Sequence, residues 1–168
     1  MDRAALDLAV ELGIPCGGWC PKGRVAEDGP IASRYPLTET SSADYAQRTE
    51  RNVRDSDGTL ILARGVRLTG GTAQTHEVAV RLKRPCLVID LTSPLPSTAI
   101  LLWFETRRIK TLNVAGPRES KQPGIYVETL RYLREVLCSF WRPNRPNVLV
   151  ARRRLGSNKT ARIRPSRR

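Results

Sequence analysis

The stretch Thr59-Leu60-Ile61-Leu62-Ala63 is apolar after its first residue and shows no alternation of polar and apolar side chains. This pattern is typical of a strand buried on both faces, as in a parallel sheet covered by helices. A glycine-containing loop from Gly65 to Gly71 follows and leads into a helix from Thr72 to about Lys83. A second apolar run, Cys86-Leu87-Val88-Ile89-Asp90, comes next. The order strand, helix, strand predicts two parallel strands joined by a right-handed crossover.

The same alternation continues toward both ends of the chain. Apolar spacing and capping residues predict further helices over 2–12, 42–55, 97–107 and 123–140, and short strands over 14–19 and 111–114. We therefore expect residues 1–141 to form one α/β domain, with a Rossmann-like parallel sheet flanked by helices. The chain opens directly on a helix, whereas domains of this type begin with a strand. We accordingly expect the sheet to lack its first strand, and the chain to oligomerise, aggregate or unfold easily.

The charge of the chain is concentrated at one end. The 168 residues carry a net charge of +13, but residues 142–168 contain ten Lys and Arg and no acid, which leaves only +3 on residues 1–141. A segment this basic and this poor in apolar residues cannot bury much surface, so we expect a disordered tail. Such a tail predicts weak binding to DNA or RNA without sequence preference.

Composition also excludes several classes of protein. The four cysteines lack paired spacing and His76 is the single histidine, so no metal site is expected. No apolar run approaches the ~20 residues that span a bilayer. The first residues lack the apolar core of a signal peptide. We expect a cytoplasmic protein with reduced cysteines and no membrane association.

The triplet Gly70-Gly71-Thr72 is the first candidate for a binding site. It lies between a buried strand and a helix, where unpaired backbone N–H groups and the helix dipole favour an anion. Glycine lets the backbone approach a phosphate, and Thr72 and Thr75 add hydroxyl groups. The alternative interpretation is a tight loop with a capping threonine. Position at the carboxyl end of a parallel strand favours a ligand.

Two other loops are expected at the same edge of the sheet. Lys22 and Arg24 lie in a charged loop after the strand predicted over 14–19, which suits a lid or phosphate clamp, although a solvated loop has the same composition. Asn113, Gly116 and Arg118 are expected at the carboxyl end of the last predicted strand, and Arg118 could bind phosphate through two hydrogen bonds.

Glu77 is the one candidate for a catalytic role. It follows Thr72 by five residues on the predicted helix. It is either a carboxylate that holds a ribose hydroxyl or transfers a proton, or an exposed helix glutamate. His76 is interpreted as a surface residue.

Several collinear motifs resemble one known family. These are Asp2-Arg3-Ala4-Ala5-Leu6-Asp7, Gly17-Gly18-Trp19-Cys20-Pro21-Lys22-Gly23-Arg24, Glu27-Asp28-Gly29, Tyr35-Pro36-Leu37-Thr38-Glu39-Thr40, Arg48-Thr49-Glu50, Asn52-Val53, Ser56-Asp57, Gly70-Gly71-Thr72 and Leu112-Asn113-Val114-Ala115-Gly116-Pro117-Arg118-Glu119-Ser120. Over residues 2–138 the chain resembles the molybdenum-carrier family, in the Rossmann-like superfamily of the lysine-decarboxylase-like (LOG) nucleotide hydrolases and the DNA-processing Smf proteins. The resemblance implies a nucleotide or a phosphorylated cofactor as ligand, with molybdenum cofactor as one candidate.

The resemblance also bears on individual residues. Family members carry a strand and a Gly-Gly-x-Thr-Gly phosphate loop directly before the residues matched by Asp2 and Arg3, which makes these two residues candidate ligand contacts. In LOG enzymes a glycine-rich motif ends in a catalytic glutamate, and Gly70, Gly71 and Glu77 have that spacing. However, Ala73 and Gln74 replace the second glycine and the threonine of that motif.

Three functions follow from these observations. The first is a binding protein for a small phosphorylated ligand. The second is a hydrolase of the N-glycosidic bond of nucleoside monophosphates, with Glu77 assisting and Arg118 or Arg3 on the phosphate. The third is a nucleic-acid binder that works through its tail. The sequence leaves open the identity of the ligand, whether any reaction is catalysed, and the number of chains in the assembly.

Overall fold

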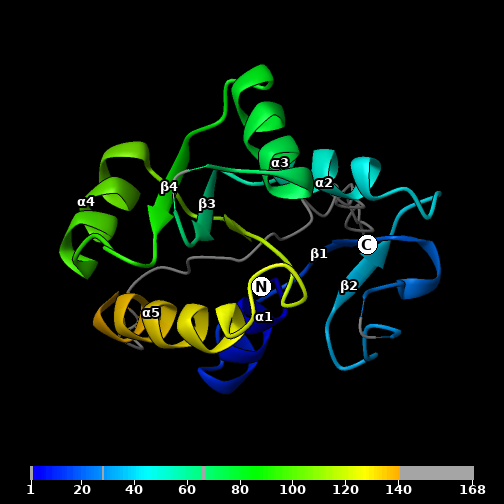
Figure 1. Cartoon of the computed structure of the whole chain (residues 1–168), viewed down its shortest axis with the longest axis horizontal. Coiled ribbons are helices and arrows are strands. Elements are labelled where there is room, and N and C mark those ends of the chain that lie inside the picture. The colour runs from blue at the N-terminus through cyan, green and yellow to red at the C-terminus, as the bar shows by residue number, and fades with distance from the viewer. Residues whose placement is uncertain (1, 28, 66, 141–168) are drawn as a thin grey trace, which may run out of the picture.

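The computed structural model describes residues 2–27, 29–65 and 67–140. The helices are α1 (Asp2–Glu11), α2 (Tyr45–Arg54), α3 (Gly70–Arg81), α4 (Ser97–Arg107) and α5 (Ile125–Phe140), with a 3-10 turn η1 (Lys22–Arg24). The strands are β1 (Gly18–Cys20), β2 (Leu37–Glu39), β3 (Gly58–Ala63), β4 (Cys86–Asp90) and β5 (Leu112–Ala115). The fold is α/β with parallel strands flanked by helices, as the sequence predicts (Figure 1). The tail predicted over 142–168 lies outside the described residues.

The larger sheet is built around β3. Its order is β4-β3-β5, with all strands parallel, and Ile61 lies beside Val88 on one side and Ala115 on the other. Every residue of β3 is buried. This central position is the physical reason why the run from Thr59 to Ala63 has no polar side chain facing water.

Helices cover both faces of this sheet (Figure 1). Leu60 and Leu62 point into the main apolar core, which is shared with α1, α4 and α5. Successive side chains of a strand point to opposite faces, so Ile61 faces the other side. There α2 and α3 pack together through Val53, Val78 and Ala79.

A second, two-stranded parallel sheet is formed by β1 and β2. The strand predicted over 14–19 begins only at Gly18, and β2 was not predicted at all. The side chain of Asn52 on α2 replaces a neighbouring strand for Trp19. Its Oδ1 accepts from the Trp19 N–H at 2.8 Å and its Nδ2 donates to the Trp19 carbonyl at 3.1 Å. The small sheet is thereby fixed to α2.

The carboxylate of Asp7 joins three parts of the chain. It accepts hydrogen bonds from the hydroxyls of Tyr35, at 2.6 Å, and Tyr126, at 2.8 Å, and from the Arg34 guanidinium at 3.0 Å. Tyr35 precedes β2 and its ring is buried, whereas Tyr126 lies at the start of α5. Asp7 therefore ties α1 to α5 and to the segment that leads into the small sheet.

None of the helices in the described part of the chain is long and apolar enough to cross a membrane.

Candidate phosphate-binding site

The start of α3 presents backbone N–H groups. Thr69, at the N-cap, has an extended backbone and no capping side-chain bond, and its carbonyl accepts from the N–H groups of Thr72 and Ala73 at 3.2 and 3.3 Å. The N–H groups of Gly70 and Gly71 make no hydrogen bond within residues 2–27, 29–65 and 67–140. Two donors at the positive end of a twelve-residue helix are therefore available to an anion.

The two glycines have different roles at this turn. Gly70 has a φ of +54°, in the left-handed region that side chains rarely adopt. The backbone of Gly71 needs no such conformation, and a Cβ there would meet no atom within 4 Å. The start of α3 is thus uncovered, and Gly71 tolerates a small side chain without strain.

Thr72 and Thr75 face inward rather than toward a ligand. Both are buried, at 6% exposure each. The Thr75 hydroxyl donates to the Gly71 carbonyl at 2.8 Å, so this hydroxyl stabilises the first turn of the helix. Neither hydroxyl therefore faces a ligand: that of Thr75 stabilises the helix, and Thr72 is packed inside the protein.

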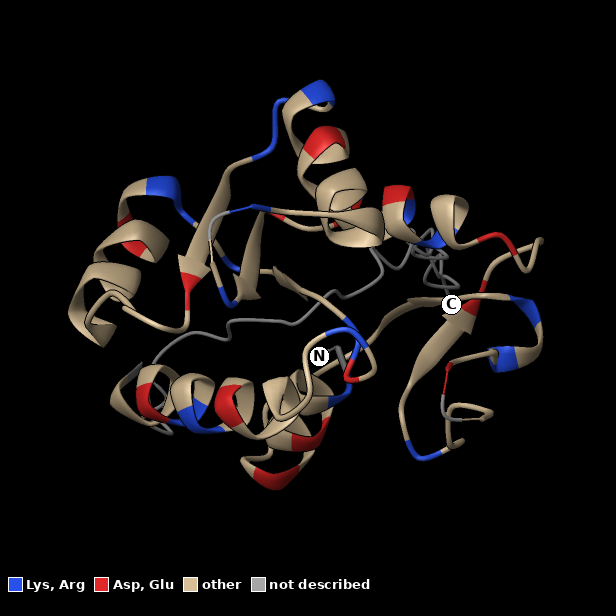
Figure 2. Cartoon of the chain, in the orientation of Figure 1, with Lys and Arg blue, Asp and Glu red and all other residues tan. Residues whose placement is uncertain are grey.

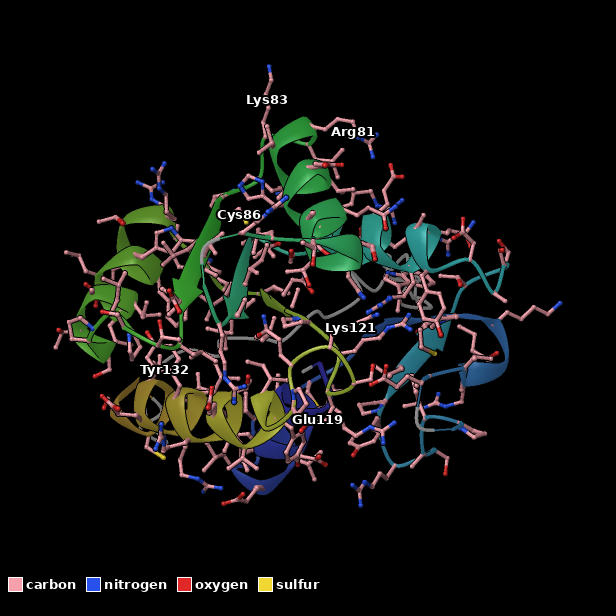
Figure 3. All side chains as sticks on the ribbon, in the orientation of Figure 1. Arg81, Lys83, Cys86, Glu119, Lys121 and Tyr132 are labelled. Atoms are coloured by element: carbon pink, nitrogen blue, oxygen red, sulfur yellow. The ribbon has the colours of Figure 1, made fainter. Side chains whose placement is uncertain are left out.

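The loop between β5 and α5 is fixed to the carboxyl end of β3. Gln122 accepts from the Arg64 N–H at 2.9 Å and donates to the Arg64 carbonyl at 3.2 Å. The Arg64 guanidinium in turn donates to both carboxylate oxygens of Glu128, at 3.0 and 2.7 Å. Figure 2 shows basic residues in this loop, and Figure 3 shows Glu119 and Lys121 on it, whereas Arg81 and Lys83 mark the far end of α3.

The end of β4 is joined to the same edge. Asp90 accepts from the Gly65 N–H at 2.9 Å and from the Thr92 hydroxyl at 2.7 Å. These hydrogen bonds, that from Gly65 first, lower the pKa of the Asp90 carboxyl. Asp90 therefore holds, as a carboxylate, the beginning of the loop that leads to α3.

Arg118 is an exposed cation in the loop after β5. Its guanidinium lies over the Tyr45 ring at 5.0 Å, and its side chain is 54% exposed. Tyr45 is the first residue of α2. Helix α2 leads into β3 and α3 follows it, and the two helices pack side by side. Helices that connect parallel strands run opposite to the strands, so both begin at the carboxyl edge of the sheet. Arg118 and the start of α3 thus lie at one edge.

Arg3 belongs to the same edge. Asp7 bonds to Tyr126 and Glu11 pairs with Arg134, so α1 and α5 run in the same direction. The first turn of α1 therefore lies beside the residues that precede α5. Arg3 is half-buried there. Asp2 begins the helix, and Gly116 directly follows β5.

Two other predicted residues, Arg24 and Asn113, lie elsewhere or have other partners. Arg24 donates to the carbonyls of Ile31, Ala32, Tyr35 and Leu37, so its guanidinium organises the segment before β2. Asn113 lies within β5 and donates to the Thr59 hydroxyl at 3.2 Å. Asn113 is the second residue of β5 and pairs with Thr59 near the beginning of β3, so the expectation that it lies at the carboxyl edge is wrong; it lies inside the strand, as the range predicted over 111–114 already implied.

Lys22 and Glu77 are exposed. Glu77 follows Gly70 by seven residues, which places it about 10 Å along the helix axis. Its carboxylate has no hydrogen-bond partner in the part of the chain that the structure describes.

The structure adds residues that the sequence did not single out. Ser120 donates its hydroxyl to Glu27 at 2.7 Å, and the Arg118 Nε lies 4.0 Å from the same carboxylate. The Tyr45 ring lies against the Arg118 guanidinium. Ser120 stands beside Arg118 in the sequence and could have been included, whereas Tyr45 and Glu27 come close only through the fold. Among the described residues, no group of three or more His, Cys, Asp or Glu could hold a metal ion.

Comparison with known proteins gives two matches. Residues 1–137 match the model of a family described as "Circularly permutated YpsA SLOG family". A crystal structure of a protein named "Putative molybdenum carrier protein", from Syntrophus aciditrophicus SB, is 48% identical and has a TM-score of 0.76. The match covers 81% of this chain and 87% of that chain. None of the curated proteins matches.

Proposed function

The chain belongs to the Circularly permutated YpsA SLOG family, and on this premise we propose that it binds a nucleotide or a phosphorylated cofactor at the carboxyl edge of its larger sheet. A phosphate of the ligand lies at the start of α3, where Gly70 and Gly71 donate their N–H groups. Arg118 supplies a positive charge from the loop after β5, and Arg3 adds a second cation at this edge.

One observation carries this proposal: the first two N–H groups of α3 have no partner among the described residues, and a Cβ on either glycine would meet no atom within 4 Å. An anion there gains two hydrogen bonds and a favourable interaction with the helix dipole. The ligand sites of open α/β sheets lie at this edge. Gln122 joins the loop after β5 to the end of β3, and Asp90 joins the end of β4 to the beginning of the loop that leads to α3.

The name of the similar protein suggests which ligand to test first. Molybdate is a tetrahedral oxyanion, and the molybdenum cofactor carries a phosphate, so either could use helix N–H groups and a guanidinium. A nucleoside monophosphate presents the same phosphate chemistry. We therefore propose molybdenum cofactor or a nucleotide as the physiological ligand, carried rather than converted.

Substitution of Gly71 tests the site. Gly71→Asp puts a carboxylate where the anion binds; two charges ~4 Å apart repel by up to about 4 kcal/mol, and solvent reduces this, so affinity should fall between about tenfold and a thousandfold. Gly71→Ala is the matched control, because a Cβ meets nothing there. Affinities for AMP, inorganic phosphate and molybdate should fall only in the Asp variant. Equal affinity of the two variants for these ligands would show that the ligand does not bind at the start of α3.

The alternative function is hydrolysis of the N-glycosidic bond of a nucleoside monophosphate. It is suggested by the position of Glu77 on α3, at the spacing of the LOG catalytic glutamate. Glu77→Gln keeps the size of the side chain and removes its capacity to transfer a proton. A carrier should keep its affinity for AMP within about tenfold and release no adenine in either form. Release of adenine by the parent, abolished in Glu77→Gln with binding retained, would establish the hydrolase instead.

A further inference from the structure

The carboxylate of Glu27 already occupies a group of donors suited to an oxyanion. Its Oε2 accepts from the Ser120 hydroxyl at 2.7 Å, its Oε1 accepts from the Ser120 N–H at 3.2 Å, and the Arg118 Nε lies 4.0 Å from Oε2. A hydroxyl, a backbone N–H and a guanidinium are the donors that phosphate oxygens take in proteins. Here an internal carboxylate takes them.

This contact joins two distant segments at the protein surface. Glu27 follows η1, and Ser120 lies 93 residues later, in the loop after β5. The hydrogen bond from the Ser120 hydroxyl lowers the pKa of the Glu27 carboxyl, so the group is charged at neutral pH. Because Glu27, Arg118 and Ser120 are exposed, an external anion can reach the donors without opening the core.

The donors do not depend on Glu27 for their positions. Arg118 stacks on the Tyr45 ring, and its loop is fixed by Gln122 to Arg64. The beginning of the segment that carries Glu27 is also held separately, since Glu39 accepts from the Gly23 N–H at 2.6 Å. Departure of Glu27 would therefore leave the donor group intact and release only the residues after η1.

We propose that Glu27 competes with a tetrahedral oxyanion for the donors of Arg118 and Ser120. Binding of the oxyanion displaces the Glu27 carboxylate and releases residues 25–27. The ligand class is a phosphate group, either free or carried by a nucleotide. The inference rests on the proposed function in so far as Arg118 serves both. It adds Ser120 as a ligand contact, and it adds the Glu27 carboxylate as a group that lowers the affinity for phosphate.

Phosphate affinity of the full chain at fixed ionic strength tests the proposal. Glu27→Gln removes the competing charge and should tighten inorganic phosphate about tenfold. Glu39→Gln is the matched control, because it loosens the same segment at Gly23 without touching Arg118 or Ser120, and should change affinity by less than about twofold. Ser120→Ala added to Glu27→Gln should cancel the gain. A parallel titration with AMP decides the source: a gain for both ligands indicates a phosphate carried by a nucleotide, and a gain for inorganic phosphate alone indicates the free ion.

Hydrogen–deuterium exchange gives an independent measurement. Phosphate should speed exchange of the residues after η1 while slowing exchange of residues 118–122. Equal phosphate affinity of the parent and Glu27→Gln, including no binding by either, would overturn the proposal, as would protection of both segments. If Gly71→Asp loses phosphate binding and Glu27→Gln has the phosphate affinity of the parent, the site at α3 is supported and only the competition by Glu27 is refuted. A gain that survives Gly71→Asp would confirm the competitor and place the anion away from α3.

Discussion

The Cys86 thiol shows how burial alters one ionisable group. It begins β4 and packs against the apolar cluster of Val53, Val78 and Ala79 between α2 and α3. Burial raises the pKa of Cys86 from 9.0 to about 11. The unfolded chain, whose thiol keeps the lower pKa, releases this proton first as pH rises. The contribution of the neutral thiol to stability is therefore complete below about pH 9 and is lost as pH rises toward about 11.

Unfolding by urea with a thiol reductant, at pH 8, 9 and 10, measures this effect. The parent should lose stability over this range, and Cys86→Ala should lose less. Cys138→Ala, at an exposed position, should follow the parent. Tyr132, whose pKa burial raises to about 12, titrates above this range in the native state and is common to all three proteins. Parallel curves for the parent and Cys86→Ala would contradict the assignment.

Single residues also show the limit of the sequence. Gly-Gly-Thr after a buried strand predicts the turn at the start of α3, because only local backbone chemistry is needed. The sequence does not tell which glycine is indispensable: the positive φ belongs to Gly70, whereas Gly71 is open. Arg24 was also predicted to contact the ligand. In the structure its guanidinium donates to four backbone carbonyls within residues 31–37, and only the folded loop brings these carbonyls together.

Among the elements, the helices and the strands of the larger sheet were predicted, whereas β1 was predicted with the wrong bounds and β2 was missed. Strand β3 is identified by its continuous apolar run, since both faces are buried. Strands β1 and β2 have three residues each, too few for a pattern to develop. Their partners also include the Asn52 amide, more than 30 residues from Trp19, which no local pattern reveals.

The Asn52 contact predicts a measurable contribution to stability. Asn52→Ala leaves the N–H and carbonyl of Trp19 without their partners, at a cost of about 1–2 kcal/mol, of which the higher helix propensity of alanine returns about 0.5 kcal/mol. Glu50→Ala, on the same helix, removes only an exposed ion pair with Arg81 and should cost less than about 0.5 kcal/mol. Urea unfolding compares the two. An Asn52→Ala variant as stable as Glu50→Ala would show that β1 does not depend on this amide.

At the scale of the whole chain, the order of strands and helices predicted the α/β class because right-handed crossovers leave few alternatives. The division of the molecule into a three-stranded and a two-stranded sheet was not predictable, because it depends on which strands pair. Parallel strand direction accounts for the loops after β3 and β5 at one edge of the larger sheet, whereas the loop that contains Lys22 and Arg24 follows β1, which belongs to the other sheet. Asn113 was misplaced because it was assigned to the end of the strand, whereas it is the second residue of β5 and pairs with Thr59 near the beginning of β3.

The basic residues after residue 141 lead to a prediction for the whole chain. The ten Lys and Arg of residues 142–168 should give weak DNA binding that falls steeply with salt, with log K changing by about −0.9 per phosphate contact for each unit of log salt. A chain ending at residue 141 should lose this binding and keep its affinity for phosphate. Fluorescence anisotropy with a labelled duplex at several salt concentrations measures both slope and loss. Full binding by the shortened chain would place the nucleic-acid surface on the folded part.

Binding of a phosphate group to the first N–H groups of α3 can be observed directly. Amide chemical shifts of the ¹⁵N-labelled full chain, followed during titration with AMP and inorganic phosphate, observe these groups directly. We expect the Gly70 and Gly71 amides to shift saturably, with the same dissociation constant as the Arg118 Nε, and Gly71→Asp to abolish these shifts. Saturable shifts elsewhere, with the Gly70 and Gly71 amides unchanged, would contradict binding at the start of α3.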